Sequence, residues 1–581
     1  MKSRIWVFAC FLSLTASMYG AASNLSPDLA GLPPAQIVNV IIQYTVTPNQ
    51  AKLITLLGLG GVLNDQLGVI NSVSATLPMA AVTLIARDSQ VVYISLNRPV
   101  KMSLDYAEPA INALTAFQNG YDGTGVGIAI IDSGVGTHPD LYNSKAASRV
   151  VYNQDFTTKK QPAAYNDSYG HGEHVAGILA GDASQSVGAQ FTHTFRGIAP
   201  NANLINLRAL DKNGAGTDAS VILAIQQAIA LKAQYNIRVI NLSLGRGVIE
   251  SYTRDPLCRA VERAWQAGIV VVVAAGNGGR DNTHNTNGYG TINSPGNDPL
   301  VITVGAMNDK RTLTRSDDTI ASYSSKGPAL FDHVVKPDVV APGNRIISLL
   351  SPGSTMGTTY PSNAVALNYF ETGSPTGNSP YYFTLSGTSM AAPMVSGAAA
   401  LMIQKDSTLT PDIIKARIMK TATKNFPAFS TVTDSSTGLS YTSQYDIFTV
   451  GAGYLDTWAA LNDAERPVGI AASPIATYDS ATGNVYVVNA NTALWGSTAL
   501  WGSTALWGST ALWGSSEWVN SSTALWGSTA LWGSTALWGS GTSASSSTVA
   551  GFTALWGSTA LWGSSTADAS ESSAITINGE N

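Results

Sequence analysis

The chain has 581 residues, a formal net charge of −5 and a pI near 5.7, which argues against nucleic acid as its main partner. Only 12% of the residues are charged and 55 are glycine, a balance that suits an exported protein. The length is enough for one large core with smaller units at its ends.

The first 22 residues have the pattern of a secretory signal peptide. Lys2 and Arg4 precede an apolar stretch that ends at Leu14, and small residues follow it. The apolar stretch is too short for a stable membrane span, although an anchor that is not cleaved stays an alternative. Removal of residues 1–22 would leave Cys258 as the single cysteine, so no intramolecular disulfide could form. We therefore expect a secreted, extracellular protein, with Cys258 as a buried small side chain.

Residues 23–104 show the pattern of a small α+β unit. Apolar and alternating runs predict strands, and runs with helical spacing predict helices between them. The expected order is strand Ile37–Tyr44, helix Pro48–Leu57, strands Val62–Leu67 and Val69–Leu77, helix Pro78–Ala86 and strand Val91–Leu96.

Residues 105–463 alternate between buried-strand runs and helices, which predicts an α/β fold with a doubly wound, mostly parallel sheet covered on both faces. The expected strands are Val126–Asp132, Leu204–Leu210, Arg238–Leu244, Ile269–Val273 and Leu300–Val304. The expected helices are Ser220–Tyr235, Leu257–Ala267, Met390–Gln404 and Pro411–Ala422.

Three polar residues stand at the ends of these elements. Asp132 closes an apolar strand, His171 opens a small-residue helix, and Ser389 opens an Ala/Gly-rich helix in Gly387–Pro393. Burial in a core gives no reason for a carboxylate or a hydroxyl at these positions, because a buried polar group is costly unless it is paired. A hydroxyl made nucleophilic by imidazole, with a carboxylate orienting the ring, requires these three groups. Strand ends and helix starts meet at the carboxyl edge of a parallel sheet, where ligands bind.

These segments, in the order Asp, His, Ser, resemble the subtilisin family (subtilases, peptidase S8) of secreted serine endopeptidases over residues 105–463. The resemblance implies that Asp132 orients the imidazole, that His171 acts as general base and then acid, and that Ser389 attacks the scissile carbonyl. It also implies that Asn277, which follows a buried strand, donates to the oxyanion together with the Ser389 backbone N–H.

Substrate binding follows from the same resemblance. Segments near 214–216 and 243–245 would pair as strands with an extended peptide. The S1 pocket would lie between two short walls of small, uncharged residues, which favours broad specificity with an apolar or aromatic P1 residue. The expected substrate-binding residues are Gly214, Gly216, Ser243, Leu244, Gly245, Ala274, Ala275 and Gly276.

The resemblance further implies that residues 23–104 are an inhibitor-type prodomain with a ferredoxin-like fold. Such a prodomain assists folding, occupies the active site and is removed by self-cleavage, here between about Asn97 and Ala107. An independent binding module is the alternative. No cofactor is required for the chemistry, but structural calcium is plausible because Asp140 matches a calcium ligand of many subtilases. Glu173 stands where the family usually has Thr or Ser, and we expect it to point to solvent.

The remaining chain divides into a linker (464–491), hexapeptide repeats (492–564) and a C-terminal tail (565–581). Thr-Ala-Leu-Trp-Gly-Ser occurs nine times in the repeats, and in an extended chain this spacing places every Trp on one face. A disordered low-complexity segment, a stacked β-structure, and an aromatic surface for glycans, cell envelope or self-association are the open alternatives.

The expected partners are protein or peptide substrates and the prodomain itself, with a cell-surface contact through the repeats left open. Two other function classes compete with the peptidase. One is a catalytically inactive binding protein with the same fold, and the other is an adhesion protein whose peptidase activity is secondary. The presence of all three triad residues disfavours the first.

Overall fold

A computed structural model describes residues 24–26, 29, 32–97, 99–100, 109–162, 165–282, 286–312, 314–434, 437–479, 484–488, 517–519 and 576–580. The predicted signal peptide and the hexapeptide repeats lie outside the described residues. Within those ranges, no helix combines the length and the apolar composition needed to cross a membrane.

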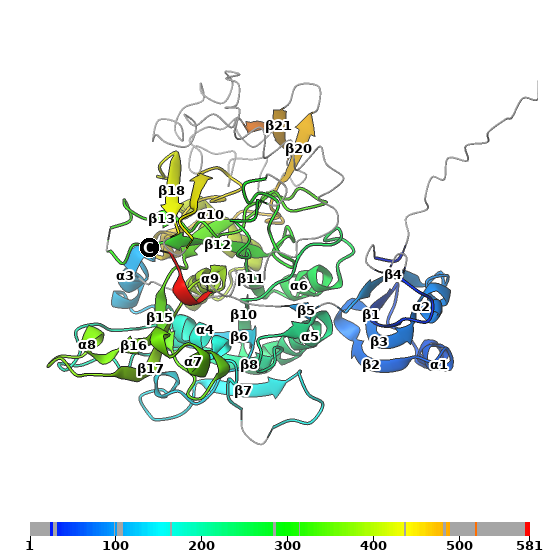
Figure 1. The fold of residues 1–581 in the computed structure, drawn as a ribbon, viewed down its shortest axis with the longest axis horizontal. Helices are drawn as coiled ribbons and strands as arrows, with labels where there is room; N and C mark the ends of the chain where they lie inside the picture. Colours follow the sequence, from blue (N-terminus) through cyan, green and yellow to red (C-terminus); the bar gives the residue numbers. More distant parts are fainter. Residues whose placement is uncertain are drawn as a thin grey trace, which may run out of the picture.

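The centre of the molecule is an eight-stranded sheet in the order β13-β12-β11-β10-β6-β8-β7, with β14 also pairing with β12 (Figure 1). All its pairs are parallel except that between β12 and β13, so the predicted mostly parallel sheet is confirmed. Its strands are β6 (Gly127–Asp132), β7 (Val150–Asp155), β8 (Asn203–Arg208), β10 (Ile237–Leu242), β11 (Val270–Ala274), β12 (Ile302–Asn308), β13 (Thr319–Ile320) and β14 (Val339–Pro342).

Helices cover both faces of this sheet. One pair, α4 (His171–Ala180) and α9 (Thr388–Lys405), packs together against the strands, and a second pair, α5 (Asp218–Tyr235) and α6 (Pro256–Gln266), packs against β6, β8, β10 and β11 (Figure 1). The helices α3 (Ala113–Gln118), α10 (Pro411–Thr421) and α11 (Thr457–Asn462) complete the layers.

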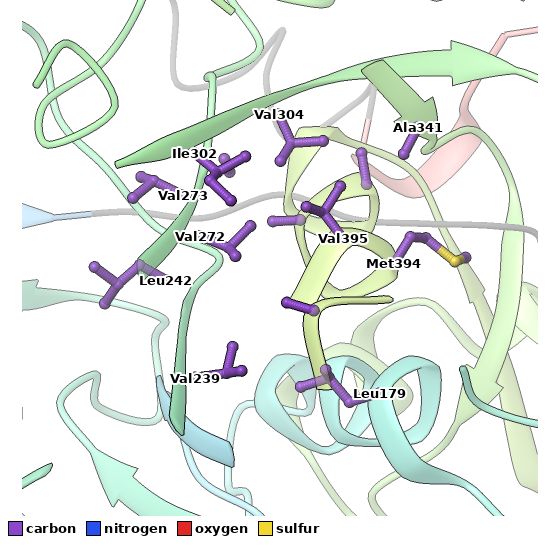
Figure 2. Close-up of a cluster of buried hydrophobic side chains, with 14 of the residues drawn as sticks. Leu179, Val239, Leu242, Val272, Val273, Ile302, Val304, Ala341, Met394 and Val395 are labelled. Atoms are coloured by element: carbon purple, nitrogen blue, oxygen red, sulfur yellow. The ribbon is translucent and has the colours of Figure 1, made fainter. Parts of the chain in front are cut away.

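The helix α9 is the longest buried helix beside the sheet. Every residue from Thr388 to Ile403 is buried, and Figure 2 shows Val395 and Met394 among side chains of β11, β12 and β14. Complete burial of an aliphatic side chain contributes about 1.5–3 kcal/mol, so many such residues hold one helix firmly. The position of its first turn, which carries Ser389, is therefore set by the core.

A separate four-stranded antiparallel sheet forms the N-terminal unit (residues 37–96), in the order β2-β3-β1-β4. Its elements are β1 (Ile37–Tyr44), α1 (Gln50–Gly58), β2 (Val62–Leu67), β3 (Ser72–Pro78), α2 (Met79–Ile85) and β4 (Val91–Leu96), as the sequence predicts. Three starts differ from the prediction, the smallest shift being that of α2, which begins at Met79 with Pro78 as its N-cap. The helix α1 begins later because the Asn49 side chain accepts from the Lys52 N–H, and β3 begins later because 68–70 form a 3₁₀ turn.

The N-terminal unit packs on α5 and α6 (Figure 1). Gln43 Nε2 donates to the Arg254 carbonyl (2.7 Å), and Arg259 Nη1 donates to Gln43 Oε1 (2.7 Å). The Val69 N–H also donates to Gln226 Oε1 (3.1 Å). The apolar residues of the unit that join the large core are Ile41, Leu67 and Ile70.

Smaller elements surround the main sheet. They are the two-residue strands β5 (Pro99–Val100) and β9 (Gly216–Thr217), the sheet of β15 (Ile346–Leu349), β17 (Asn378–Leu385) and β16 (Ala364–Ala366), the helices α7 (Thr355–Thr359) and α8 (Leu367–Phe370), and the hairpin of β18 (Phe429–Thr433) and β19 (Ser440–Gln444). A last sheet joins β20 (Ile475–Asp479), β21 (Asn484–Val488) and β22 (Glu517–Val519).

The stretch 464–491 differs from the linker that its sequence suggests. It contains β20 and β21, and Ser473 is buried, with its hydroxyl donating to Asp338 Oδ1 (2.5 Å). The Val335 N–H donates to the carbonyl of Pro474 (2.8 Å). This part of the chain is therefore packed on the large domain as far as Ala476, whose N–H donates to the His333 carbonyl (2.8 Å).

Candidate active site

Asp132 and His171 form a buried pair at the carboxyl edge of the large sheet. Asp132 is the last residue of β6, and His171 is the first residue of α4, which follows Gly170 in the left-handed conformation. His171 Nδ1 lies 2.8 Å from Asp132 Oδ1 and 2.9 Å from Oδ2. Both side chains are 1% exposed, so the carboxylate is placed to fix the ring tautomer and to stabilise an imidazolium.

The start of α4 depends on Asp167, which the sequence analysis missed. Its carboxylate accepts from the Tyr169 N–H (3.0 Å) and from the Glu173 N–H (2.9 Å). Its complete burial raises the pKa of the Asp167 carboxyl. An Asp shortly before a predicted helix start is a capping signal that could have indicated it.

Ser389 lies in the first turn of α9, and its hydroxyl donates to the Ser243 carbonyl (3.1 Å). The Ser243 hydroxyl in turn donates to the Ser389 carbonyl (2.6 Å). His171 Nε2 is buried and has no hydrogen-bond partner within the described ranges. Because α4 and α9 pack against each other, the imidazole and the hydroxyl come from neighbouring helix starts. Catalytic hydrogen bonds are often not formed until substrate binds.

A chain of buried polar groups holds Ser243. Asn241 Nδ2 donates to the Ser243 hydroxyl (2.9 Å), and the Ser396 hydroxyl donates to Asn241 Oδ1 (2.8 Å). The sequence analysis did not assign either residue, although a polar side chain inside an apolar strand or helix is itself a signal. These bonds tie the end of β10 to α9 at the level of the hydroxyl of Ser389.

Asn277 follows β11 and is oriented by Thr388. The Thr388 N–H donates to Asn277 Oδ1 (2.9 Å), and the Thr388 hydroxyl donates to the same oxygen (3.1 Å). The Gly276 N–H donates to the Thr388 hydroxyl (3.0 Å). With its oxygen held in this way, the side chain has its NH₂ group on the side away from Thr388. Thr388 is thus a supporting residue that the sequence motif contained but the analysis did not single out.

The predicted peptide-binding strand near 214–216 is paired with another part of the chain. β9 lies antiparallel to β5, with Val100 opposite Gly216 and Pro99 opposite Thr217. The Asn97 side chain also accepts from the Ala219 N–H (2.7 Å). A stretch of extended chain from the end of the N-terminal unit therefore occupies this strand edge.

The predicted pocket walls follow β10 and β11, and both pass close to Asn293. A Cβ added at Gly245 would lie 3.0 Å from Asn293 Cβ, and one at Gly276 would lie 2.9 Å from Asn293 Cγ. Asn293 therefore packs between the two walls, a position that no local pattern in the sequence indicates. The wall residues Ser243, Leu244, Gly245, Ala274, Ala275 and Gly276 carry no charge.

Glu173 does not point to solvent, as its sequence position had suggested. It is 1% exposed, because α4 is buried at every position, and it accepts a hydrogen bond from the Gly136 N–H. Burial is the main cause that raises the pKa of the Glu173 carboxyl to about 8, and the nearby Asp167 charge acts in the same direction. A protonated carboxyl therefore lies within one turn of His171 at neutral pH.

The surroundings of Asp140 do not fit a metal ion. The Ser184 hydroxyl (2.9 Å) and the Gln185 N–H (3.0 Å) donate to its Oδ1, and the Tyr382 hydroxyl (2.7 Å) donates to Oδ2. A cation needs oxygen ligands in place of these donors. The part of the chain that the structure describes also contains no group of three or more His, Cys, Asp or Glu residues that could hold a metal ion. The expectation of a metal ligand at Asp140 is therefore not supported.

Comparison with known proteins gives one family for this fold and site. The family model described as "Subtilase family" matches residues 123–439. The chain is 40% identical over 365 residues to serine protease AprX of Bacillus subtilis (strain 168), which covers 61% of this chain and 74% of that protein. It is 32% identical over 429 residues to subtilisin E of the same organism, covering 73% of this chain and 94% of that protein.

Among solved structures, the chain is similar to fervidolysin from Fervidobacterium pennivorans, described as a keratinolytic enzyme related to subtilisin. The two share a TM-score of 0.54 and 21% sequence identity, over 76% of this chain and 64% of that one. At this identity the similarity concerns the fold, which is the α/β arrangement described above.

Proposed function

The chain belongs to the subtilase family of serine endopeptidases, and on that premise we propose that Asp132, His171 and Ser389 are its catalytic triad. The observation that carries the assignment is the buried Asp132–His171 pair at the start of α4, a helix that packs against α9, whose first turn holds Ser389. The family match covers all three residues. Each stands at the end of an element whose position the core fixes.

In this mechanism the Ser389 hydroxyl turns from the Ser243 carbonyl toward His171 Nε2 when substrate binds. Oγ attacks the scissile carbonyl carbon while its proton passes to Nε2, and Asp132 stabilises the resulting imidazolium. The tetrahedral intermediate collapses to an acyl-enzyme as His171 returns the proton to the leaving amine. Water then attacks the ester carbonyl, with His171 accepting its proton, and Ser389 is released.

Asn277 is proposed to stabilise the oxyanion with the Ser389 backbone N–H. The two hydrogen bonds from Thr388 to its oxygen hold the amide in one orientation before the reaction starts. A donor fixed in this way costs no reorganisation when charge develops. The N-terminal end of α9 adds a positive potential at the same place.

The substrate is proposed to be a protein segment in extended conformation, with an apolar or aromatic P1 side chain. The pairing of β5 with β9 is the support for the extended backbone. The uncharged walls at 243–245 and 274–276 give no partner for a cationic P1 side chain. Asn293, which packs between them, adds a polar but uncharged contact.

We propose that residues 23–104 are an inhibitor-type prodomain of a zymogen. The N-terminal unit packs on α5 and α6, and its last strand leads to β5, which lies along β9 beside the proposed site. Cleavage would then fall between 101 and 107, beyond the paired strand. The signal-peptide pattern of residues 1–22 supports secretion. A contact of the repeats at 492–564 with the cell envelope stays a proposal from their tryptophan-rich composition.

The test is a comparison of the full-length protein with its Ser389→Ala variant. We expect the unaltered protein to lose its N-terminal unit by intact mass and to hydrolyse a peptide with an aromatic P1 residue. The variant should do neither, with activity reduced by about 10⁴-fold or more. A variant that matures and cleaves as well as the unaltered protein would show that another group is the nucleophile.

A further inference from the structure

Residues 576–580, far from the catalytic domain in sequence, are bound to it in the structure. Figure 1 draws them in red beside α9 and β15. The Ser386 N–H donates to the Thr576 carbonyl (2.9 Å), and Asn363 Nδ2 donates to the Ile577 carbonyl (2.6 Å). Main-chain atoms are recognised at these two positions, as in the binding of a peptide in a groove.

The side chain of Glu580 is the anchor of this segment. It is 5% exposed, and its Oε1 accepts from the Ser322 N–H (2.8 Å) while Arg280 Nη2 donates to Oε2 (3.1 Å). The backbone of Glu580 is held twice by Asn344, whose Nδ2 donates to its carbonyl (2.7 Å) and whose Oδ1 accepts from its N–H (2.9 Å). A buried carboxylate that lost its partners would be strongly destabilised, so this pocket is specific for an acidic side chain.

The residue before the anchor has to be glycine. Gly579 has a φ of +62°, and a Cβ there would lie 2.5 Å from Ser386 Oγ and 2.6 Å from Arg345 Cγ. The close contacts with these side chains and the positive φ together exclude other residues at this position. By contrast, the side chain of Asn578 is exposed and faces an open cavity of about 380 Å³ that Arg345 also lines.

The first residue of the docked segment, Thr576, contacts the loop that leads to the nucleophile. Ser386, whose N–H it accepts from, stands three residues before Ser389. The Ser386 hydroxyl also accepts from the Arg345 N–H (3.0 Å), and the Gly387 N–H donates to the Gly343 carbonyl (2.7 Å). The loop thus has supports from the catalytic domain on one side and from the docked segment on the other.

We propose that Thr576–Glu580 is an intramolecular peptide ligand of the catalytic domain, and that its docking positions the Ser386–Gly387 loop and with it Ser389. The groove selects a short segment that contains Gly579-Glu580. Glu580 is a positioning residue, because it acts on the nucleophile through Ser386 and touches no substrate. The inference rests on the proposed role of Ser389.

The experiment compares Glu580→Gln with Asn578→Ala, both in the full chain. Two quantities are measured well below the melting temperature of each variant: kcat and KM on a peptide with an aromatic P1 residue, and the rate at which a sulfonyl fluoride inactivates Ser389. We expect Glu580→Gln to lower kcat and the inactivation rate about tenfold with KM within twofold, because small displacements of reacting groups reduce rate strongly. Asn578→Ala, at an exposed position of the same segment, should change neither.

A second variant covers the case in which Glu580→Gln does not fold. Asn363→Ala removes the donor to the Ile577 and Thr384 carbonyls and should lower the inactivation rate about threefold, in line with the loss of the hydrogen bond to the docked segment. Equal kcat and inactivation rates in the folded variants would overturn the inference, and so would a lowered melting temperature with unchanged rates. If Ser389→Ala still cleaves peptide, the nucleophile assignment fails instead, which separates the two hypotheses.

Discussion

The large parallel sheet and the N-terminal sheet differ in how their strands are buried. In the large parallel sheet, the strands β6 and β11 are buried at every residue and belong to one core shared with α9. In the N-terminal unit, β1 alternates: Val40 and Ile42 lie in its own small core, while Ile41 between them joins the large core. The first sheet is stabilised by the single core that surrounds it. The side chains of the second sheet are divided between its own small core and the large core.

This difference in burial indicates which part of the molecule can be removed without disturbing the rest. A small antiparallel sheet that places one face on another domain has a stability that depends on that contact. The proposed catalytic residues, by contrast, are attached to elements that the large core holds on both sides. A processing event that removes the N-terminal unit would therefore leave the catalytic edge intact, as the proposed zymogen requires.

In the region of the large parallel sheet, the largest expected effect comes from Asn277→Ala. Loss of the oriented amide should lower kcat about 10²–10³-fold with little change in KM, because the donor acts on charge that appears only in the transition state; this magnitude is the one known for subtilisin itself. Steady-state kinetics on the aromatic-P1 peptide measure it, with Asn462→Ala, at an exposed position, as control. An unchanged kcat would place the oxyanion elsewhere.

A second test addresses Glu173, the buried carboxyl inside the same region. Its pKa is raised to about 8 in the folded state from an ordinary value of 4.5, so the folded state binds a proton that the unfolded state has lost between these pH values. The free energy of unfolding of the protein that carries Glu173 should therefore fall as pH rises from about 4.5 to about 8. The fall should be up to about 1.4 kcal/mol per pH unit, relative to the Glu173→Gln variant.

Denaturant unfolding in the Ser389→Ala background measures this difference without self-digestion. Parallel pH profiles for the two forms of residue 173 would mean that Glu173 is ionised in the folded protein at neutral pH.

The smallest expected effect concerns the N-terminal sheet and its contact with the large domain. Gln43→Ala removes the contacts to Arg254 and Arg259, so the N-terminal unit should dissociate about tenfold faster after cleavage, since a hydrogen bond to a charged group contributes about 1.5–3 kcal/mol. The readout is the delay between loss of the N-terminal unit by mass and the appearance of peptidase activity. Gln66→Ala, exposed on β2, should leave the delay unchanged.

Much of the fold could be predicted from the sequence because its signals are local. Continuous apolar runs predicted the central parallel strands but not β7 and β14, and the polar residues that end them predicted which positions meet at the sheet edge. The small shifts, such as the later start of α1 at Gln50, come from capping by a single side chain. The repeats at 492–564 lie outside the described residues, so the alternatives for them stay open.

What sequence alone determined was the set of residues that the chemistry needs: a carboxylate, an imidazole and a hydroxyl at element ends, with Asn277 after β11. What only the tertiary structure decided was the environment of each group. Burial of α4 on all sides turned Glu173 inward, donors from two separate segments closed around Asp140, and Glu580 reached Arg280 across 300 residues. Local patterns carry no record of such contacts, because each depends on which distant segment fills the space beside it.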